Sequence, residues 1–271
     1  MLDVAACDGL VRELRTLLAT RADQRADAIL ATLFKELYDD DAHRGAACGF
    51  VHDRGLPELF LAVLEHLVDA DGGALHLQRS WDAIDSAAGI LDNYCGVDLG
   101  AADVRLLDVL GHDMVGRALH VLQRCLDFQM LWLSRSSALE SLLLLAGRLL
   151  GLDALAVEPG AAGRLLPALL RLLQRTADYK VCDYVDAPCI FVIALLLQRF
   201  GREAVAPELC PPLAAALRRQ LRGLQPKLHV QLDCLVTLGR LAGDEEPGRV
   251  ARELLAAHGR LLAPEAWEVT A

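Results

Sequence analysis

The ratio of leucine and alanine to β-branched residues constrains the fold of this chain more than any other feature. Its 271 residues include 57 Leu and 41 Ala but only 5 Ile and 6 Thr. Leu and Ala favour helices, whereas strands favour β-branched and aromatic residues. Hydrophobic residues make up 54% of the chain, which is enough for a sizeable core and excludes a mostly disordered protein. The composition therefore predicts an all-α fold.

Apolar residues recur at spacings of three and four along most of the chain, as in amphipathic helices. Short breaks with Gly or Pro separate these segments, and Pro57, Pro167 and Pro212 are each expected in a first helical turn, where the missing N–H costs nothing. No long polar linker interrupts the series, so we expect one domain. The predicted helices span residues 3–19, 24–38, 42–53, 57–69, 81–95, 103–127 (with a break at Gly111 or Gly116), 129–151, 162–176, 187–200, 208–222, 228–242 and 248–262.

Three segments end in the same way, as a mostly apolar helix that closes on Arg, one or two apolar residues and Gly. The closing glycines, Gly151, Gly201 and Gly243, are 50 and then 42 residues apart. A loop and an amphipathic helix follow each glycine. A period in the forties, built from one buried and one half-exposed helix, is typical of a helical solenoid in which neighbouring units bury each other's apolar faces.

The junction within residues 46–67 carries a family resemblance. A helix rich in small residues ends at Gly55, and a new helix opens around Pro57. This Gly-apolar-Pro step resembles the junction between the second and third helices of an armadillo repeat, and segments 81–95 and 138–151 resemble further second helices. The uneven period equally suits the related HEAT type. The resemblance implies a right-handed α-solenoid superhelix of about five degenerate repeats, whose third helices line a concave surface.

The resemblance also implies a domain arrangement and a class of function. Residues 1–40 are expected to form N-terminal capping helices, residues 41–247 the repeats, and residues 248–271 a C-terminal capping helix and tail. Armadillo and HEAT proteins are typically binding scaffolds without catalytic activity. We therefore expect a non-enzymatic scaffold or adaptor, without a cofactor, that binds a segment of a partner protein along its third-helix surface. A nuclear-import receptor is not predicted, because Trp does not recur at repeat spacing and Asn93 is the only Asn.

Acidic residues concentrate in the first half of the chain, and basic stripes follow further along. Residues 1–135 carry 22 Asp and Glu against 12 Lys and Arg, whereas the remainder carries 15 of each. Helical spacing places the charged residues of each expected third helix on one face. The acidic stripe consists of Glu58, Glu65 and Asp69, and the first basic stripe of Arg117, His120 and Arg124.

The later basic stripes are the candidate partner-binding residues. Arginine pairs with carboxylates through two parallel hydrogen bonds and stacks on aromatic rings, so these stripes suit an acidic or aromatic-acidic segment. A charged face is also what any amphipathic helix exposes to water, and this second interpretation remains open. The residues expected to contact the partner are Arg164, Arg171, Arg175, Arg218, Arg219 and Arg222.

A cluster of ionisable residues supports an alternative function. Asp39, Asp40 and Asp41 carry oxygen ligands for Mg²⁺, so an all-α enzyme with a divalent-metal and diphosphate site is the alternative to a scaffold. His43 stands where a DDxxD motif needs its last Asp, and the three acidic residues also suit a helix N-cap. Cys48 and His52 lie one helical turn apart and His43 is near, so they could supply three zinc ligands, but no fourth ligand is evident. We therefore predict neither a metal site nor catalytic residues.

Several other classes are excluded or disfavoured by the sequence. The longest apolar run has nine residues, too few to span a bilayer, and the first residues lack a secretory signal. A net charge of −10 disfavours direct nucleic-acid binding. The eight Cys contain no CxxC pair and are expected to be buried thiols in the cytoplasm or the nucleus. A structural subunit of a larger complex is a further alternative.

Overall fold

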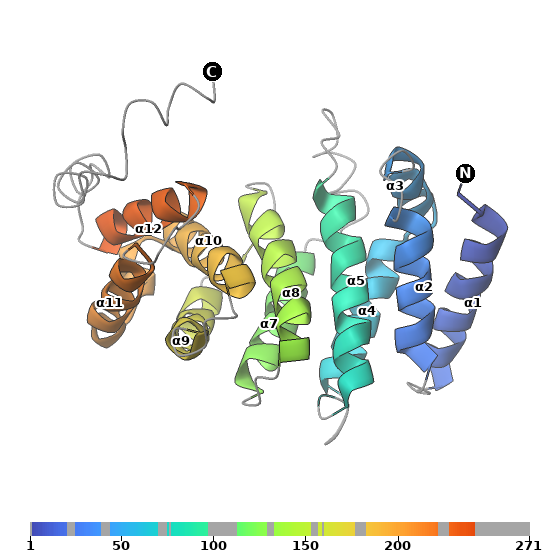
Figure 1. Ribbon diagram of the computed structural model, residues 1–271, viewed down its shortest axis with the longest axis horizontal. Coiled ribbons are helices and arrows are strands. Elements are labelled where there is room, and N and C mark those ends of the chain that lie inside the picture. The colour runs from blue at the N-terminus through green and yellow to red at the C-terminus, as the bar shows by residue number, and fades with distance from the viewer. Residues whose placement is uncertain are drawn as a thin grey trace.

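The computed structural model is all-helical throughout its described residues, which are 2–20, 25–38, 44–69, 75, 77–96, 113–128, 133–152, 157–158, 160–176, 183–221 and 228–241. No strand occurs in these ranges. The helices follow one another along the longest axis of the molecule, from α1 at one end to α11 and α12 at the other (Figure 1). The α-helices are α1 (Val4–Thr20), α2 (Ala26–Tyr38), α3 (Arg44–Asp53), α4 (Leu56–Asp69), α5 (Gln78–Gly96), α7 (Met114–Asp127), α8 (Leu133–Gly151), α9 (Gly160–Thr176), α10 (Asp183–Phe200), α11 (Cys210–Leu221) and α12 (Leu228–Leu241).

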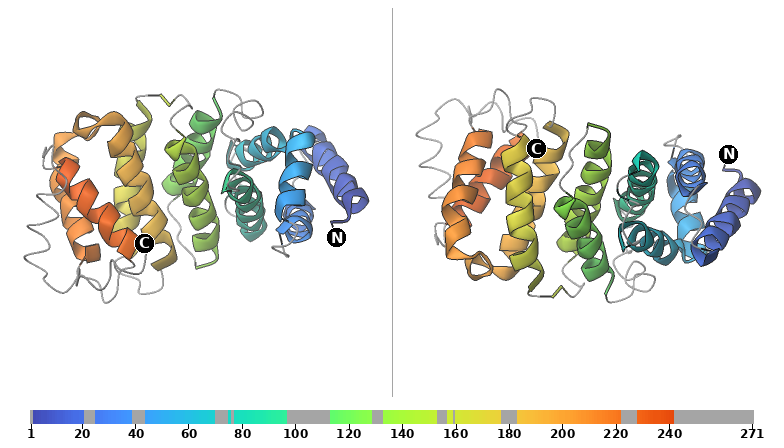
Figure 2. Two further views of the ribbon diagram at one scale, coloured as in Figure 1. Left: turned by 90° about the horizontal axis from the view of Figure 1, so that it is seen from above. Right: turned by 90° about the horizontal axis from the view of Figure 1, so that it is seen from below.

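The helices pack in two rows. The first row is α2, α5, α8, α10 and α12, and the second row is α1, α4, α7, α9 and α11, each helix contacting the next one in its row. Contacts between α1 and α2, α4 and α5, α7 and α8, α9 and α10, and α11 and α12 join the two rows. Figure 2 shows the same progression from above and from below. The arrangement is compatible with a helical repeat class, in which contacts are made to neighbours along the stack.

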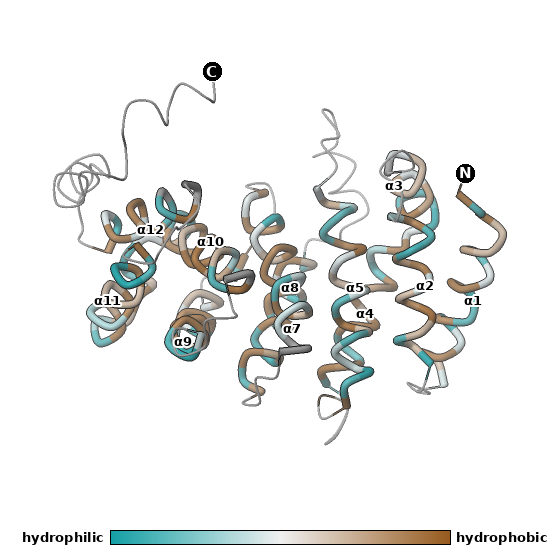
Figure 3. The backbone as a smooth tube through the Cα atoms, in the orientation of Figure 1, coloured by the Kyte–Doolittle hydropathy of each residue, from teal (hydrophilic) through white to brown (hydrophobic). Residues whose placement is uncertain are grey.

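Position in the stack explains the different apolar patterns of the helices. The central helices α8 and α10 contact neighbours on both sides within the first row as well as the second row. Both bury residues on most of their circumference, among them Leu139, Leu143 and Leu149 of α8 and Ile190 and Leu196 of α10. The second-row helices α7 and α9 are amphipathic instead, because one of their faces is open to solvent. Apolar segments recur along every helix (Figure 3).

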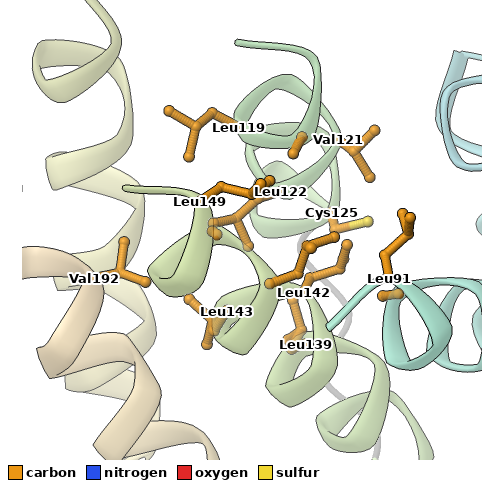
Figure 4. Packing of buried hydrophobic residues seen from close by; sticks show 14 of the residues in the cluster. Leu91, Leu119, Val121, Leu122, Cys125, Leu139, Leu142, Leu143, Leu149 and Val192 are labelled. Carbon is orange, nitrogen blue, oxygen red and sulfur yellow. The ribbon is translucent and has the colours of Figure 1, made fainter. Parts of the chain in front are cut away.

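One apolar layer runs through the middle of the molecule. Leu91 of α5, Leu122 of α7, Leu142 of α8 and Val192 of α10 are all fully buried. Figure 4 shows side chains from these four helices meeting between the two rows. The same cluster continues to α1 and to α12, so the core is continuous over the described helices.

The junction at Gly55 is a sharp turn, as the sequence predicts. Gly55 adopts φ +57°, a left-handed conformation that favours glycine, and its N–H donates to the carbonyl of His52 at 3.0 Å. Helix α4 then begins at Leu56, and Pro57 lies in its first turn. Helix α3, which precedes the turn, packs against α2 and α4. The helix that stacks beside α5 is α2, so α3 is a short additional helix and not the counterpart of α5 and α8.

Other boundaries differ from the predictions in informative ways. Pro167 lies inside α9 and not in its first turn, because the buried Ala161 and Ala162 extend the helix toward Gly160. The residue four positions before this proline is Gly163, whose carbonyl the ring crowds. Helix α10 begins at Asp183, earlier than the predicted residue 187. The predicted helix 103–127 is described from Met114, and the predicted helix 248–262 lies outside the described residues.

The arginines that close the repeated sequence segments bind the preceding helix of the first row. The Nη2 of Arg199 in α10 donates to the carbonyl of Leu152, just beyond the end of α8, at 2.7 Å. The Nη1 of Arg240 in α12 donates to the carbonyl of Ala194 in α10 at 2.9 Å. The carbonyl of Leu152 lies at a helix end, where helical donors run out, and the carbonyl of Ala194 lies inside a helix and accepts the arginine as an additional donor. The repeated arginine therefore joins successive helices.

Arg148 makes the corresponding contact between α8 and α5. Its Nε donates to Oδ1 of Asp92, a carboxyl whose pKa is raised above the ordinary value by burial, while Arg148 acts in the opposite direction. The guanidinium passes over Gly96, where an added Cβ would lie 2.6 Å from its Cζ. The glycine at the end of α5 therefore leaves the space that Arg148 fills.

We expect the substitution Arg199→Met to lower the free energy of unfolding by about 1.5–3 kcal/mol, the range for a hydrogen bond that involves a charged group. The methionine keeps much of the aliphatic stem but leaves the carbonyl of Leu152 without this donor. Urea unfolding followed by far-ultraviolet circular dichroism measures the loss. The matched control is Arg202→Met, which replaces an exposed arginine three residues further along. Equal stabilities of the two variants would contradict the proposed role of Arg199.

Candidate partner-binding surface

The acidic stripe of α4 lies beside the basic stripe of α7. Arg117 of α7 makes two hydrogen bonds to Glu65, from Nε to Oε1 at 2.8 Å and from Nη2 to Oε2 at 2.6 Å. Its Nη1 contacts both carboxylate oxygens of Glu58, at 2.7 and 2.9 Å. The hydrogen bond to Glu65, first among several causes, raises the pKa of the Arg117 guanidinium. All the polar atoms of this guanidinium are therefore engaged within the protein.

The remaining charges of these two stripes also pair with each other. The Nε2 of His120 lies 3.1 Å from Oδ1 of Asp69, and the Nε of Arg124 lies 3.5 Å from the same oxygen. Each of the three acidic residues of α4 thus contacts a basic residue of the next helix in the row. The α4 and α7 part of the second row offers an external partner little uncompensated charge.

The arginines of α9 are exposed but have acidic neighbours. Arg164 binds Glu158 through Nη2 at 2.7 Å, and this contact lowers the pKa of the Glu158 carboxyl. Arg171 binds Oδ1 of Asp127, the last residue of α7, through Nη2 at 3.1 Å. Arg175 is half-buried in the last turn of α9. The structure therefore brings the α9 stripe next to the C-terminal end of α7.

Two of the predicted arginines differ from Arg164 and Arg171 because they make no ion pair with any described residue. Arg218 and Arg219 are exposed in the last turn of α11. Helix α11 contacts α9, the helix that carries Arg164 and Arg171. Basic residues also suit the C-terminal end of a helix, where the carbonyl dipoles are negative. Arg222, the last predicted contact residue, lies outside the described residues.

Sequence reasoning identified the stripes but missed the pairing between them. The partners are 44 to 59 residues apart, close to one spacing of the repeated segments. The available signal was an acidic stripe on one helix and a basic stripe of similar spacing one unit later. Spacing within a helix defines each stripe, whereas the pairing depends on how successive helices align in space.

The candidate metal and catalytic residues do not assemble into a site in the described part of the chain. Asp39, Asp40, Asp41 and His43 lie outside the described residues. Nowhere in the described ranges do three His, Cys, Asp or Glu side chains gather in an arrangement that could hold a metal ion. His52 is engaged with Tyr94, whose hydroxyl lies 2.9 Å from Nδ1, and burial raises the pKa of this tyrosine to about 12.

The described cysteines are free thiols, and most are buried as predicted. Cys7, Cys48, Cys125, Cys189 and Cys234 are buried, whereas Cys95 and Cys210 are half-buried. Burial raises the pKa of Cys125 and of Cys234 to about 12, so both stay protonated near neutral pH. A thiol in this state is a poor nucleophile. These side chains therefore serve as small apolar core residues.

Among the described helices, none combines the length and the apolarity needed to cross a membrane. No protein-family model matches the chain. No curated protein and no solved structure matches it either.

Proposed function

We propose that this chain is a non-enzymatic scaffold or adaptor built as a right-handed solenoid of armadillo or HEAT type, with about five units. The pairing of first-row and second-row helices supports this architecture, with each pair stacking on the next. Contacts between charged residues about one unit apart also support it. The second row corresponds to the third helices of such repeats, and the scaffold acts in the cytoplasm or the nucleus.

The observation that carries the function is the exposed arginine surface at the C-terminal part of the second row. Arg218 and Arg219 make no ion pair with a described residue, while Arg164 and Arg171 are exposed with paired guanidinium groups. We name these four residues the arginine surface. An exposed guanidinium offers paired donors to a carboxylate and a flat face to an aromatic ring. The partner is therefore an acidic or aromatic-acidic segment of another protein.

A binding assay with a defined probe tests this function. The probe is a short fluorescein-labelled peptide rich in Asp and Phe, and fluorescence anisotropy measures its dissociation constant. Replacing Arg218 and Arg219 together with Glu is expected to weaken binding at least about tenfold, because two attractions become repulsions. Added salt should weaken binding of the unmodified chain, since exposed charges are screened.

A matched variant separates local contacts from a general change in charge. Arg12 and Arg79 are exposed arginines of α1 and α5, and replacing both with Glu changes the net charge equally. This control should bind the peptide nearly as well as the unmodified chain. The double variant Arg218→Gln with Arg219→Gln removes the positive charges without adding negative charge that could destabilise the end of α11. Circular dichroism verifies that this variant is folded. Unchanged binding in both α11 variants would overturn the proposed function.

A further inference from the structure

The ion pairs of the second row fall into two classes that differ in exposure. Arg117 and Glu65 are 22% and 26% exposed and form a two-pronged pair between α4 and α7. Arg171 and Asp127 are 52% and 47% exposed, with one hydrogen bond at 3.1 Å. Arg164 and Glu158 are more exposed still. The first class is part of the helix packing, whereas the second includes the pairs of the arginine surface as well as the equally exposed contacts of Asp69 with His120 and Arg124.

We propose that Asp127 and Glu158 are internal substitutes for the partner's carboxylates, so that a bound acidic segment displaces them from Arg171 and Arg164. This inference rests on the proposed function and deepens it. The two internal acids compete with the partner segment for the same arginines, and this competition lowers the affinity of the arginine surface for acidic segments. The partner segment must carry at least two closely spaced carboxylates to replace both internal acids.

The geometry makes these two acids easy to displace. An exposed ion pair contributes little to folding, because water screens it and two side chains must be ordered to form it. Asp127 is the last residue of α7, where the negative end of the helix dipole disfavours a carboxylate. Its other oxygen accepts a hydrogen bond from Gln123 at 2.8 Å, one helical turn earlier, which holds the side chain beside its own helix. Glu158 lies two residues before the first residue of α9 and contacts Arg164, the fifth residue of that helix.

Charge complementarity identifies the occupant. Arg218 and Arg219 lie free of ion pairs with the described residues, and the two internal acids show that carboxylates fit beside Arg164 and Arg171. A carboxylate-bearing segment of a partner protein therefore matches the chemistry already present at this surface. The net charge of −10 over the whole chain opposes a long polyanion such as a nucleic acid, whose phosphates extend beyond the arginine surface.

The test removes the internal acids and measures binding of the same Asp- and Phe-rich peptide. The variant Asp127→Asn with Glu158→Gln keeps the shape of both side chains. We expect its dissociation constant to fall about two- to tenfold, because the peptide no longer competes with two weak ion pairs. The control Glu13→Gln with Asp82→Asn removes two acidic groups from α1 and α5 and should change the affinity by less than about twofold.

The outcomes separate this inference from the proposed function. If the Asp127/Glu158 variant and its control bind the peptide with equal affinity, the proposed competition is wrong. This conclusion holds even if replacing Arg218 and Arg219 abolishes peptide binding. Unchanged peptide binding in both variants at Arg218 and Arg219 would overturn the proposed function itself. A single-stranded DNA oligonucleotide of equal charge that binds as tightly as the peptide would overturn the assignment to a protein segment. Tighter peptide binding in the Asp127/Glu158 variant alone supports the inference.

Discussion

Replacing Trp81 with alanine is expected to lower the free energy of unfolding by about 3–5 kcal/mol, the range for removing a buried aromatic side chain. Trp81 is 1% exposed, and its Nε1 donates to the carbonyl of Leu75 at 2.8 Å in the connection between α4 and α5. Its ring also packs against Phe128 at the end of α7, with centroids 5.9 Å apart. The substitution thus removes core volume, the ring contact that reaches the end of α7, and the hydrogen bond to the connection between α4 and α5.

Urea unfolding followed by far-ultraviolet circular dichroism measures this effect without relying on tryptophan emission. Trp81→Phe is the matched variant, because it keeps an aromatic ring but lacks the indole N–H. It should lose about 1–2 kcal/mol, including the hydrogen bond to Leu75. A loss below about 1 kcal/mol for the alanine variant would contradict the packing described for this residue.

We expect Arg117→Met to be the next most damaging substitution, with a loss of about 2–3 kcal/mol. It leaves Glu65, which is only a quarter exposed, without its charged partner, and it also frees Glu58. Removing one member of a fully buried ion pair costs about 3–5 kcal/mol, and the partial exposure here reduces that cost. Arg117→Lys keeps the charge but not the paired donors, so its loss should be intermediate.

A double-mutant cycle isolates the interaction. Glu65→Gln, Arg117→Met and the combined variant together give the coupling energy between the two side chains, which we expect to be about 1–2 kcal/mol. Measurement in low and high salt should change this value little, because the pair is partly shielded from water. A coupling energy below about 0.5 kcal/mol would contradict the stabilising role assigned to the Glu65–Arg117 pair.

Helix positions follow from the sequence because burial imposes a periodic pattern on each segment. The start of α10 was predicted too late because Asp183, Tyr184 and Asp186 look like a polar loop, although Val185 between them is buried. The Gly55 turn and the helix before it have the local pattern of a repeat junction, which predicts α3 as a stacking helix, whereas the helix that stacks beside α5 is α2. Which helix stacks on which depends on contacts between segments about 50 residues apart, and local patterns do not report these contacts.

The candidate surface was predicted less completely than the fold. Spacing placed the arginines of each helix on one face, and the structure leaves Arg218 and Arg219 exposed without an ion pair to described residues. The same spacing could not show that Asp127 and Glu158 lie beside Arg171 and Arg164. Opposite charges on neighbouring helices are visible in the sequence only when the stacking order is already known.

The restriction of helix contacts to near neighbours has a mechanical consequence. Among the described helices, each pair is held mainly by the pairs before and after it. A load applied between the termini would pass through every junction in series, and the weakest junction would open first while the rest stayed folded. Under tension, such a molecule is expected to lengthen in steps, one junction at a time.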